Sequence, residues 1–473
     1  MATDSTRGTA RGARRFRAAL AATVVILALL ATTLALVNAH VGPRVSGVQA
    51  NPAVLVTRAG QKVVIQSDQV LAQRSADGIT IEPQIDFDAS VVGDTIEVRF
   101  ASMLHYGTDY TIRVPEAVSA YTGTTAVLET TVSTSDPYVY TLLRETRTGD
   151  DGAKLPDTVR RQPLSSPAES EAVLSAPFIQ EYAVTTSLLA AVLLEETTAA
   201  VQIANSDGGE TYTLPLPSAG SVRQLRGSGV SDLLGFSFSG EIAGEAVENI
   251  LFLYDNSDGS GVPEPLVGLD GEPLTVSDWT FVPGTTSLVA QTYDQSLYLI
   301  DALSDEAPVP LGQHGEMRGF LPGGDTLIVN DPDGEVALDL ASGESEALAL
   351  PEAAADIGGY PGEIVLLDES LDYLQMFTTP LDEASSTYES SIALVTAEGT
   401  RVVHSPAAEG TRIRDFCVSP NGQYLAVETA PADSTLDNYP VVGGYSQMST
   451  FFVDIATGEA SRGAYGFLPD WCR

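Results

Sequence analysis

Residues 416–427 read FCVSPNGQYLAV, and looser copies of this phrase recur through the second half of the chain. Residues 320–329 read FLPGGDTLIV, and residues 281–290 read FVPGTTSLVA. In each copy an aromatic residue opens a short run, a turn containing proline, glycine or asparagine follows, and an aliphatic run comes after it. This pattern is typical of two adjacent antiparallel strands joined by a tight turn. The copies predict a series of small antiparallel sheets.

The spacing of the copies indicates how these sheets are arranged. Degenerate copies begin near Tyr182, Phe236 and Tyr360. Phe281 and Phe320 are 39 residues apart, and Phe238 and Phe281 are 43 apart, a period near 40 that is typical of β-propellers. Each repeat would then be one four-stranded blade. Residues 137–473 have room for about seven blades.

The run YVYTLLRE at residues 138–145 reads as a strand, and the polar residues 147–171 after it read as a long surface loop. A propeller ring is held shut when one blade takes strands from both chain ends. We therefore expect residues 138–145 to pair with the blade built from Phe416 to Phe467. The alternative is that this run begins a blade of its own.

The phrase at residues 416–427 resembles the TolB/WD40-like repeat of bacterial propellers. The WD and GH dipeptides of true WD40 repeats are absent. The resemblance implies a propeller that serves as a binding platform, and it does not name a ligand.

Residues 51–136 show a different pattern, in which apolar and polar residues alternate, as in DTIEVRF (94–100). Such alternation predicts a small antiparallel β-sandwich with one buried face per sheet. The stretch LHYGTDYTIRV (104–114) resembles bacterial Ig-like domains of the SbsA type. The resemblance implies a spacer or adhesive module in which Gly107 and Thr108 form a turn and Tyr110 is a structural corner residue.

Residues 18–37 contain three threonines and no charged residue, and a helix of that length spans about 30 Å, the thickness of a bilayer's hydrocarbon core. Residues 1–17 hold five arginines against one aspartate, so they are expected to be a cytoplasmic tail with everything after the span outside. Residues 38–50 read as a tether. The alternative is a secretory signal cleaved after Ala39, although its apolar region would be unusually long. We expect a single-pass signal anchor that contacts the lipid bilayer through residues 18–37.

The charge of the chain limits its partners. It has 24 Lys+Arg against 63 Asp+Glu, a net charge of −39, which argues against nucleic acid as a partner. Two cysteines, Cys417 and Cys472, are expected to form a disulfide outside the cytoplasm, the alternative being two free thiols. No cysteines or histidines show zinc-ligand spacing, and we expect no cofactor or metal.

Motifs for catalysis are weak. The chain has no G-x-S-x-G elbow, and the phrase NSDGGETY (205–212) occurs once, whereas sialidases repeat such turns. The acidic loop DNSDGSG (255–261) lacks the EF-hand register and reads as a solvated turn.

We therefore expect an extracytoplasmic, non-enzymatic binding or scaffold protein whose partner is an envelope or surface protein. The alternative is an envelope enzyme or accessory subunit that holds a small ligand in the propeller's central funnel. Charged residues from several blades meeting on the axis would favour use of that funnel.

Overall fold

The computed structural model describes residues 6–38, 41–149, 152–195, 198–257, 259–304, 306–321, 324–367, 370–382, 387–460 and 463–472. The first five residues and Ala39, where the alternative cleavage site was expected, lie outside this description. The chain divides into two compact units. One comprises Met1–Leu104 and Thr108–Ser135, and the other comprises His105–Gly107 and Asp136–Arg473.

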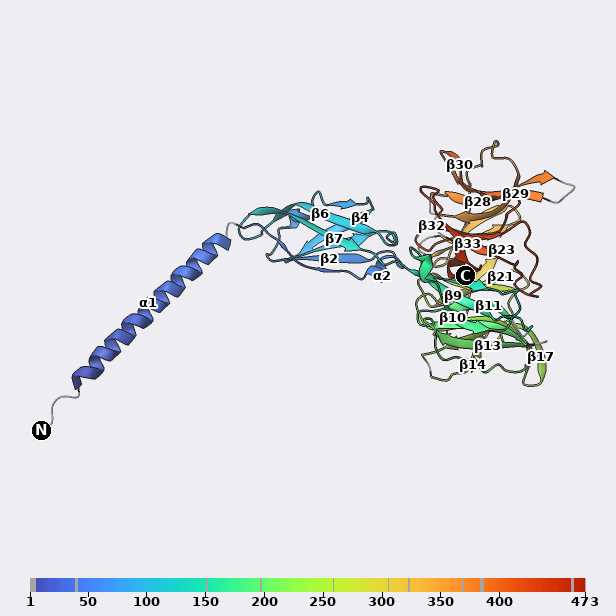
Figure 1. Ribbon diagram of the computed structural model, residues 1–473, viewed down its shortest axis with the longest axis horizontal. Coiled ribbons are helices and arrows are strands. Elements are labelled where there is room, and N and C mark those ends of the chain that lie inside the picture. The colour runs from blue at the N-terminus through green and yellow to red at the C-terminus, as the bar shows by residue number, and fades with distance from the viewer. Residues whose placement is uncertain are drawn as a thin grey trace. The chain divides into compact units, whose positions relative to one another are not determined.

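Helix α1 (Thr6–Asn38) is continuous and contains the apolar stretch (Figure 1). The hydroxyls of Thr23, Thr32 and Thr33 each donate to the carbonyl four residues earlier, over 2.7–3.0 Å. These polar groups are thus satisfied inside the helix. A search of the described residues finds no helix that is both long and apolar enough to cross a membrane.

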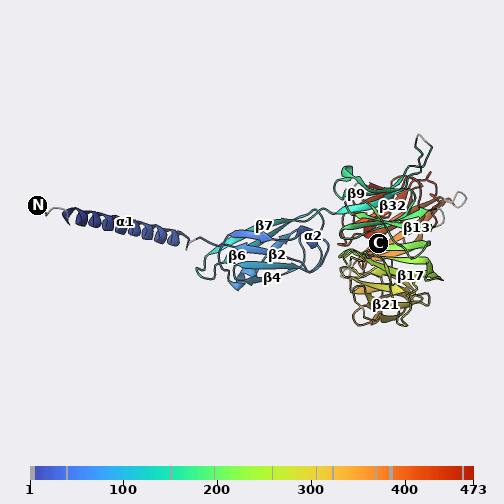
Figure 2. The same ribbon diagram turned by 90° about the horizontal axis from the view of Figure 1, so that it is seen from below.

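Two antiparallel sheets make up the rest of the first unit, and they can be followed in Figure 2. One has the order β1-β2-β5-β4 and the other β3-β6-β7. Their bounds are β1 (Val45–Gln49), β2 (Lys62–Ser67), β3 (Thr80–Glu82), β4 (Phe87–Val92), β5 (Thr95–Phe100), β6 (Asp109–Val118) and β7 (Thr125–Ser133), with short helices α2 (Pro52–Leu55) and η1 (Gln73–Ala76).

The predicted alternation in this unit is confirmed by burial. Ile96, Val98 and Phe100 on β5 are each at most 1% exposed, whereas the residues between them face outward or lie at intermediate depth. The rings of Phe100 and Tyr110 lie 6.5 Å apart, which brings the two sheets together across a shared core. At the turn before β6, Gly107 has a φ of 54°, and the N–H of Thr108 donates to the hydroxyl of Thr134 over 2.8 Å.

The second unit is a β-propeller, and its described residues form seven antiparallel sheets. The first has the order β10-β9-β8, and each of the other six has four strands in chain order. The bounds are β8 (Tyr138–Leu143), β9 (Asp157–Pro163), β10 (Glu171–Ala176); β11 (Ile179–Val184), β12 (Leu188–Glu195), β13 (Thr198–Asn205), β14 (Tyr212–Leu214); β15 (Ser221–Gly227), β16 (Leu233–Ile242), β17 (Glu245–Asp255), β18 (Glu264–Pro265); β19 (Asp278–Phe281), β20 (Ser287–Gln291), β21 (Ser296–Asp301), β22 (Val309–Gln313); β23 (Glu316–Phe320), β24 (Thr326–Asp331), β25 (Gly334–Asp339), β26 (Ser345–Ala347); β27 (Tyr360–Leu366), β28 (Tyr373–Asp382), β29 (Thr387–Thr396), β30 (Gly399–His404); and β31 (Arg412–Val418), β32 (Tyr424–Ala430), β33 (Ser449–Asp454), β34 (Ala464–Tyr465), with short helices η2 (Pro167–Glu169) and η3 (Asp470–Cys472).

The predicted repeat starts lie on first strands in five sheets and fail in one. Tyr182 lies on β11 and Tyr360 on β27, both first strands. Phe281, Phe320 and Phe416 lie on β19, β23 and β31, the first strands of their sheets. Phe236 lies on β16, a second strand, so the expected start of that repeat is wrong. Residues 233–238 of β16 are all buried, so the apolar run there belongs to a central strand of the sheet. The expected loop over residues 147–171 is also wrong, because it contains β9, whose arginines lie between buried residues.

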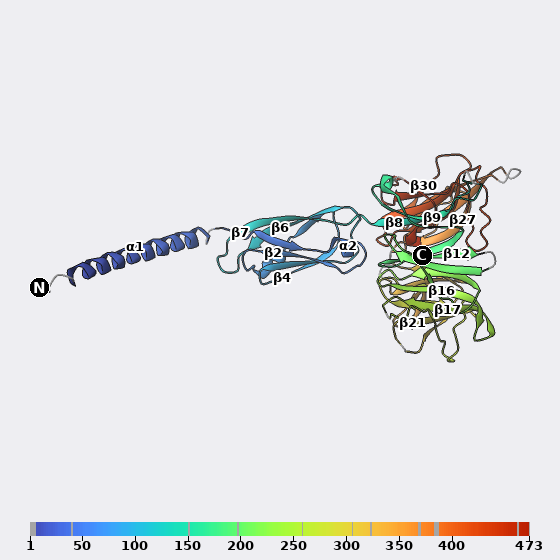
Figure 3. The same ribbon diagram turned by 60° about the horizontal axis from the view of Figure 1, so that its bottom comes forward.

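The two ends of the propeller chain meet in one sheet (Figure 3). Leu142 on β8 and Phe467 exchange main-chain hydrogen bonds of 2.8 and 3.0 Å. Residues 138–145 therefore do pair with the final repeat, but they do not join its sheet as expected. The early run begins a sheet of its own, and the C-terminal residues join that sheet, because residues just beyond β34 continue past the last sheet to the edge of β8.

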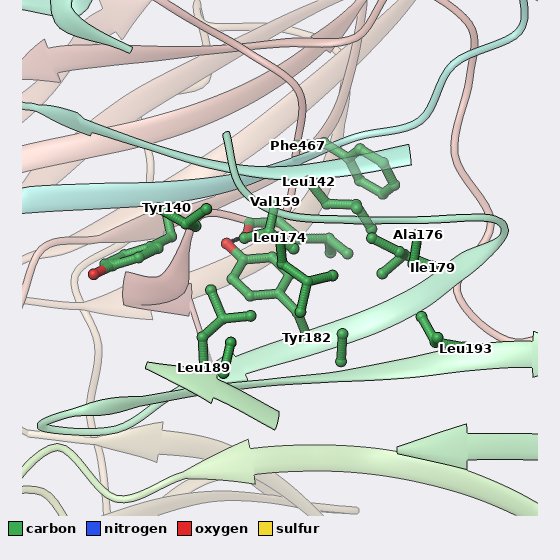
Figure 4. Packing of buried hydrophobic residues seen from close by; sticks show 14 of the residues in the cluster. Tyr140, Leu142, Val159, Leu174, Ala176, Ile179, Tyr182, Leu189, Leu193 and Phe467 are labelled. Carbon is green, nitrogen blue, oxygen red and sulfur yellow. Dashed lines mark hydrogen bonds between the residues drawn. The ribbon is translucent and has the colours of Figure 1, made fainter. Parts of the chain in front are cut away.

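A hydrophobic core forms at this closure, and Figure 4 shows Leu142, Tyr182 and Phe467 within it. Each of these three side chains is at most 1% exposed, and the hydroxyl of Tyr182 donates to the carbonyl of Leu468 over 2.6 Å. Burying a side chain of this size contributes roughly 1.5–3 kcal/mol. Strands from both chain ends thus share one core.

A buried polar cluster, here called the clamp, fastens the β32–β33 loop to the first two sheets. It consists of Arg144, Lys154, Asp157, Asp437 and Tyr439. The guanidinium of Arg144 donates to the Asp437 carboxylate over 2.7 Å, and both side chains are at most 3% exposed. The Arg144 guanidinium carbon lies 3.7 Å from the centroid of the Tyr439 ring, whose hydroxyl donates to Asp157. Lys154 also donates to Asp157, over 2.6 Å.

The C-terminal end of the closure is covalently tied. Cys417 on β31 and Cys472 form a disulfide, with their Cα atoms 5.3 Å apart. Residues 464–472, here called the closing segment, are thus held by strand pairing, by core packing and by a covalent bond.

Candidate binding site on the propeller axis

The first strands of five sheets surround a cavity of about 650 Å³, here called the axial cavity. The strands are β11, β15, β19, β23 and β31, and the lining also includes Leu468 and Cys472 of the closing segment. A smaller cavity of about 390 Å³, here called the side cavity, is lined by β23, β24, β25 and β27 and shares Arg318 with the axial cavity. Both volumes fall within the size range of small-molecule sites.

Four of the five first strands that line the axial cavity, and β27 at the side cavity, share a backbone irregularity that β19 lacks. Register shifts interrupt five first strands, at Ile179/Glu181, Arg223/Arg226, Met317/Gly319, Pro361/Ile364 and Ile413/Asp415. A β-bulge adds a residue to one strand of a pair and changes the direction of the side chains around it. The residues passed over by the pairing include Gln180, Gln224, Arg318, Glu363 and Arg414, so polar side chains occupy the bulges.

The bulges bring charged groups to the axis of a strongly acidic chain. The axial cavity is lined by four arginines and four acidic residues, namely Arg223, Arg226, Arg318 and Arg414 with Glu181, Asp278, Asp415 and Glu428. Four of these groups form ion pairs between strands, Arg226 with Asp278 and Arg414 with Glu428, so charges of opposite sign are held close together there.

Arg226 and Asp278 form one such pair, between β15 and β19. The guanidinium lies 3.0 Å from the carboxylate, and the side chains are 25% and 37% exposed. Arg226 also lies above the buried ring of Trp279, with its guanidinium carbon 5.6 Å from the centroid. The amide of Gln224 donates to the carbonyl of Ser277 over 2.8 Å, which fixes the bulge against β19.

Arg414 and Glu428 form a second pair, which also holds the closing segment. Their side chains lie 2.5 Å apart, and Glu428 is 1% exposed. The other carboxylate oxygen of Glu428 accepts from the N–H of Leu468 over 2.7 Å. Burial raises the pKa of Glu428, and Arg414 opposes this effect.

The side cavity is more acidic than the axial cavity. Arg318 lies 3.2 Å from Glu316 and 3.9 Å from Glu335, and Glu363 completes the set of carboxylates. Burial raises the pKa of Glu335 and of Glu363, and neighbouring carboxylates add to both increases.

An exposed aromatic residue lies in the wall of the axial cavity. Tyr293, in the turn between β20 and β21, is 63% exposed. Its hydroxyl accepts a hydrogen bond from the side-chain amide of Asn249 over 2.5 Å. Asn249 is itself held by the hydroxyl of Ser239. The hydroxyl end of the Tyr293 side chain is therefore held by a hydrogen bond, while most of the side chain is exposed.

The residues singled out from the sequence contribute to this site only in part. Cys472 lines the axial cavity, and its partner Cys417 lies on the lining strand β31. Gly107, Thr108 and Tyr110 are not among the described residues that line either cavity.

The axial arginines were not predicted, although the repeat contains a signal for them. Arg318 and Arg414 each precede the opening phenylalanine of a repeat by two positions, and Gln180 precedes Tyr182 in the same way.

The sequence matches no protein-family model and no curated protein. Solved structures with similar folds are β-propellers. TolB from Acinetobacter baumannii is 12% identical, with a TM-score of 0.34 over 77% of this chain and 80% of that one. The β-propeller domain of Cps50 (Swd1) from Myceliophteria thermophila is 14% identical, with a TM-score of 0.35 over 60% of this chain and 84% of that one. The Dos1 propeller is 12% identical, with a TM-score of 0.37 over 67% and 86%. These low identities and scores assign no function to this chain.

Proposed function

We propose that this chain is a membrane-anchored extracytoplasmic binding protein whose ligand occupies the axial cavity of the propeller. The observation that carries the proposal is the set of bulged first strands, which direct polar side chains from several blades into one cavity. Bulges of this kind are over-represented next to functional sites. This convergence is the feature expected to favour the alternative, an envelope enzyme or accessory subunit that holds a small ligand in the funnel. The pairing of the charged groups is what favours binding over catalysis in that funnel.

Binding fits the cavity better than catalysis does. Its charged groups are held in pairs such as Arg226–Asp278 and Arg414–Glu428. A paired guanidinium and carboxylate offer fixed hydrogen-bond donors and acceptors to a ligand. We therefore propose a receptor or scaffold role, with an envelope component as the partner.

The remaining parts of the proposal rest on the sequence. Residues 18–37 would anchor the chain in the bilayer, with the five N-terminal arginines inside. Residues 51–136 would act as an Ig-like spacer between the membrane and the propeller. A disulfide between Cys417 and Cys472 is consistent with a compartment outside the reducing cytoplasm.

Co-purification tests the binding site. The full-length chain is purified from detergent-solubilised membranes of cells that produce it, beside Arg318→Gln and the matched control Arg113→Gln. Arg113 lies on β6 in an exposed pair with Glu129. We expect at least one envelope component to be retained by the wild type and the control and lost with Arg318→Gln. The same components on all three proteins would contradict an axial site.

Protease treatment tests the anchorage. On intact, wall-stripped cells we expect residues after the span to be cleaved and an N-terminal epitope tag to be protected. Protection of the propeller until the cells are lysed would overturn the proposed location.

A further inference from the structure

The charges around the axial cavity indicate which class of ligand it can hold. Four arginines are matched by four acidic residues, so the lining has no net charge. The adjoining side cavity adds Glu316, Glu335 and Glu363 around the shared Arg318. An anion would therefore meet as many carboxylates as guanidinium groups in the axial lining, within a chain whose net charge is −39. The lining gives an anionic ligand no excess of positive charge.

The same lining is rich in hydrogen-bonding groups of two opposite kinds. Guanidinium groups only donate, and ionised carboxylates only accept. A hydroxyl group does both, so one hydroxyl can accept from an arginine and donate to its partner carboxylate. The pair Arg226–Asp278 presents this combination, since the two side chains are 25% and 37% exposed. Glu428 is buried, so the second pair offers only the guanidinium of Arg414. A ligand with several neighbouring hydroxyls would complement such pairs without carrying charge.

Tyr293 supplies the apolar part of such a site. Its ring is 63% exposed, and its hydroxyl is held by Asn249, so the position of the ring is fixed. An exposed aromatic face beside polar side chains suits a ligand with an apolar C–H face and polar edges, because aromatic rings combine a large apolar surface with low conformational entropy.

We propose that the axial cavity binds an uncharged saccharide. This inference rests on the proposed function, because it names the ligand class of the same site. A sugar hydroxyl would bridge Arg226 and Asp278, and the C–H face of one ring would lie against Tyr293.

A glycan array tests the ligand class with the full-length protein in detergent. The array carries neutral oligosaccharides, oligosaccharides containing uronic acids, and oligosaccharides containing free amino sugars. We expect binding to neutral glycans, and titration calorimetry with the best of them measures the affinity. The corresponding free monosaccharide, titrated separately, distinguishes a soluble sugar from a polymer of the envelope.

Three variants locate the binding. Arg226→Gln removes a donor and is expected to weaken binding about tenfold or more, since hydrogen bonds to charged groups contribute roughly 1.5–3 kcal/mol. Tyr293→Ala alters an exposed side chain, so it leaves the fold intact and is expected to weaken binding several-fold. Arg113→Gln is the control and is expected to bind as the wild type does. Thermal melts show whether each variant is folded.

Two results would overturn the inference. One is preferential binding of acidic or amino glycans, and the other is neutral binding that persists unchanged in folded Arg226→Gln and Tyr293→Ala. If the array is negative while Arg318→Gln still loses an envelope component, the saccharide inference fails and the axial binding site stands.

Discussion

The main-chain N–H of Tyr140 donates to the carboxylate of Asp470 over 2.9 Å, across 330 residues of sequence. This bond joins β8 to the closing segment, two residues before the disulfide-bonded Cys472. Because burial raises the pKa of Asp470 from its ordinary value of 3.8 to about 7, the carboxyl group is expected to change its charge near neutral pH. The closure of the ring is therefore expected to respond to pH.

The first prediction concerns this response. A carboxyl whose folded pKa exceeds its unfolded pKa stabilises the fold when protonated, and that stability is lost as pH rises from about 4 through about 7. The free energy of unfolding of Asp470→Asn minus that of the wild type should thus be larger at pH 8 than at pH 5, by on the order of 2–3 kcal/mol. Urea unfolding at both pH values measures the difference. The exposed Asp88→Asn variant is the control, and a pH-independent difference for Asp470→Asn would contradict the prediction.

The second prediction concerns the clamp. Removing one partner of a buried ion pair leaves the other charge unpaired, so Arg144→Met and Asp437→Leu should each lower the free energy of unfolding by about 3–5 kcal/mol. The double variant should lose much less than the sum of the two. Arg113→Gln, in an exposed pair, should change stability by less than about 1 kcal/mol. Additive losses in the double-mutant cycle would show that the pair is not coupled.

The third prediction concerns the disulfide. Its two cysteines are 55 residues apart, and replacing both by serine should lower the free energy of unfolding by about 2–5 kcal/mol. Dithiothreitol should lower the unfolding midpoint of the wild type and leave that of the serine variant unchanged. Alkylation of the unreduced, denatured wild type should label no thiol; labelling of two thiols would contradict the bond.

The fourth prediction concerns packing beneath Arg226. A methyl group at Gly235 on β16 would overlap the ring of Trp279, which is fully buried. Gly235→Ala should therefore destabilise the propeller by about 1–3 kcal/mol. Gly229→Ala is the matched control, since no atom lies within 4 Å of the added carbon. Equal thermal midpoints for the two variants would argue against tight packing at Trp279.

The repeat of the propeller could be predicted because its signal is local. An aromatic residue, a turn and an aliphatic run within about ten residues place Phe281, Phe320 and Phe416 on first strands. Of the three weaker copies, those at Tyr182 and Tyr360 also lie on first strands, whereas the one at Phe236 lies on a second strand. The polar sequence and the terminal proline of β9 predict a loop, but its Val159 is buried in a core shared with neighbouring elements, which makes the segment a strand.

The candidate site was harder to predict because it depends on register and on distant partners. A bulge at Arg318 or Arg414 follows from how two strands pair, which a single-strand pattern does not show. The pairing of Arg144 with Asp437 depends on a loop from the last sheet reaching the first. Only the recurrence of a polar residue two positions before an aromatic one hinted at the axial lining.

The pairing of Leu142 with Phe467 also determines the order in which the strands of this sheet can form during synthesis. A ribosome makes β8 long before the closing segment, since Tyr140 and Asp470 are 330 residues apart. Until that segment emerges, one edge of β8 has no strand beside it, and unpaired edges promote association between chains. A chain that stops before residue 464 is therefore expected to keep this edge of β8 open and to associate more readily.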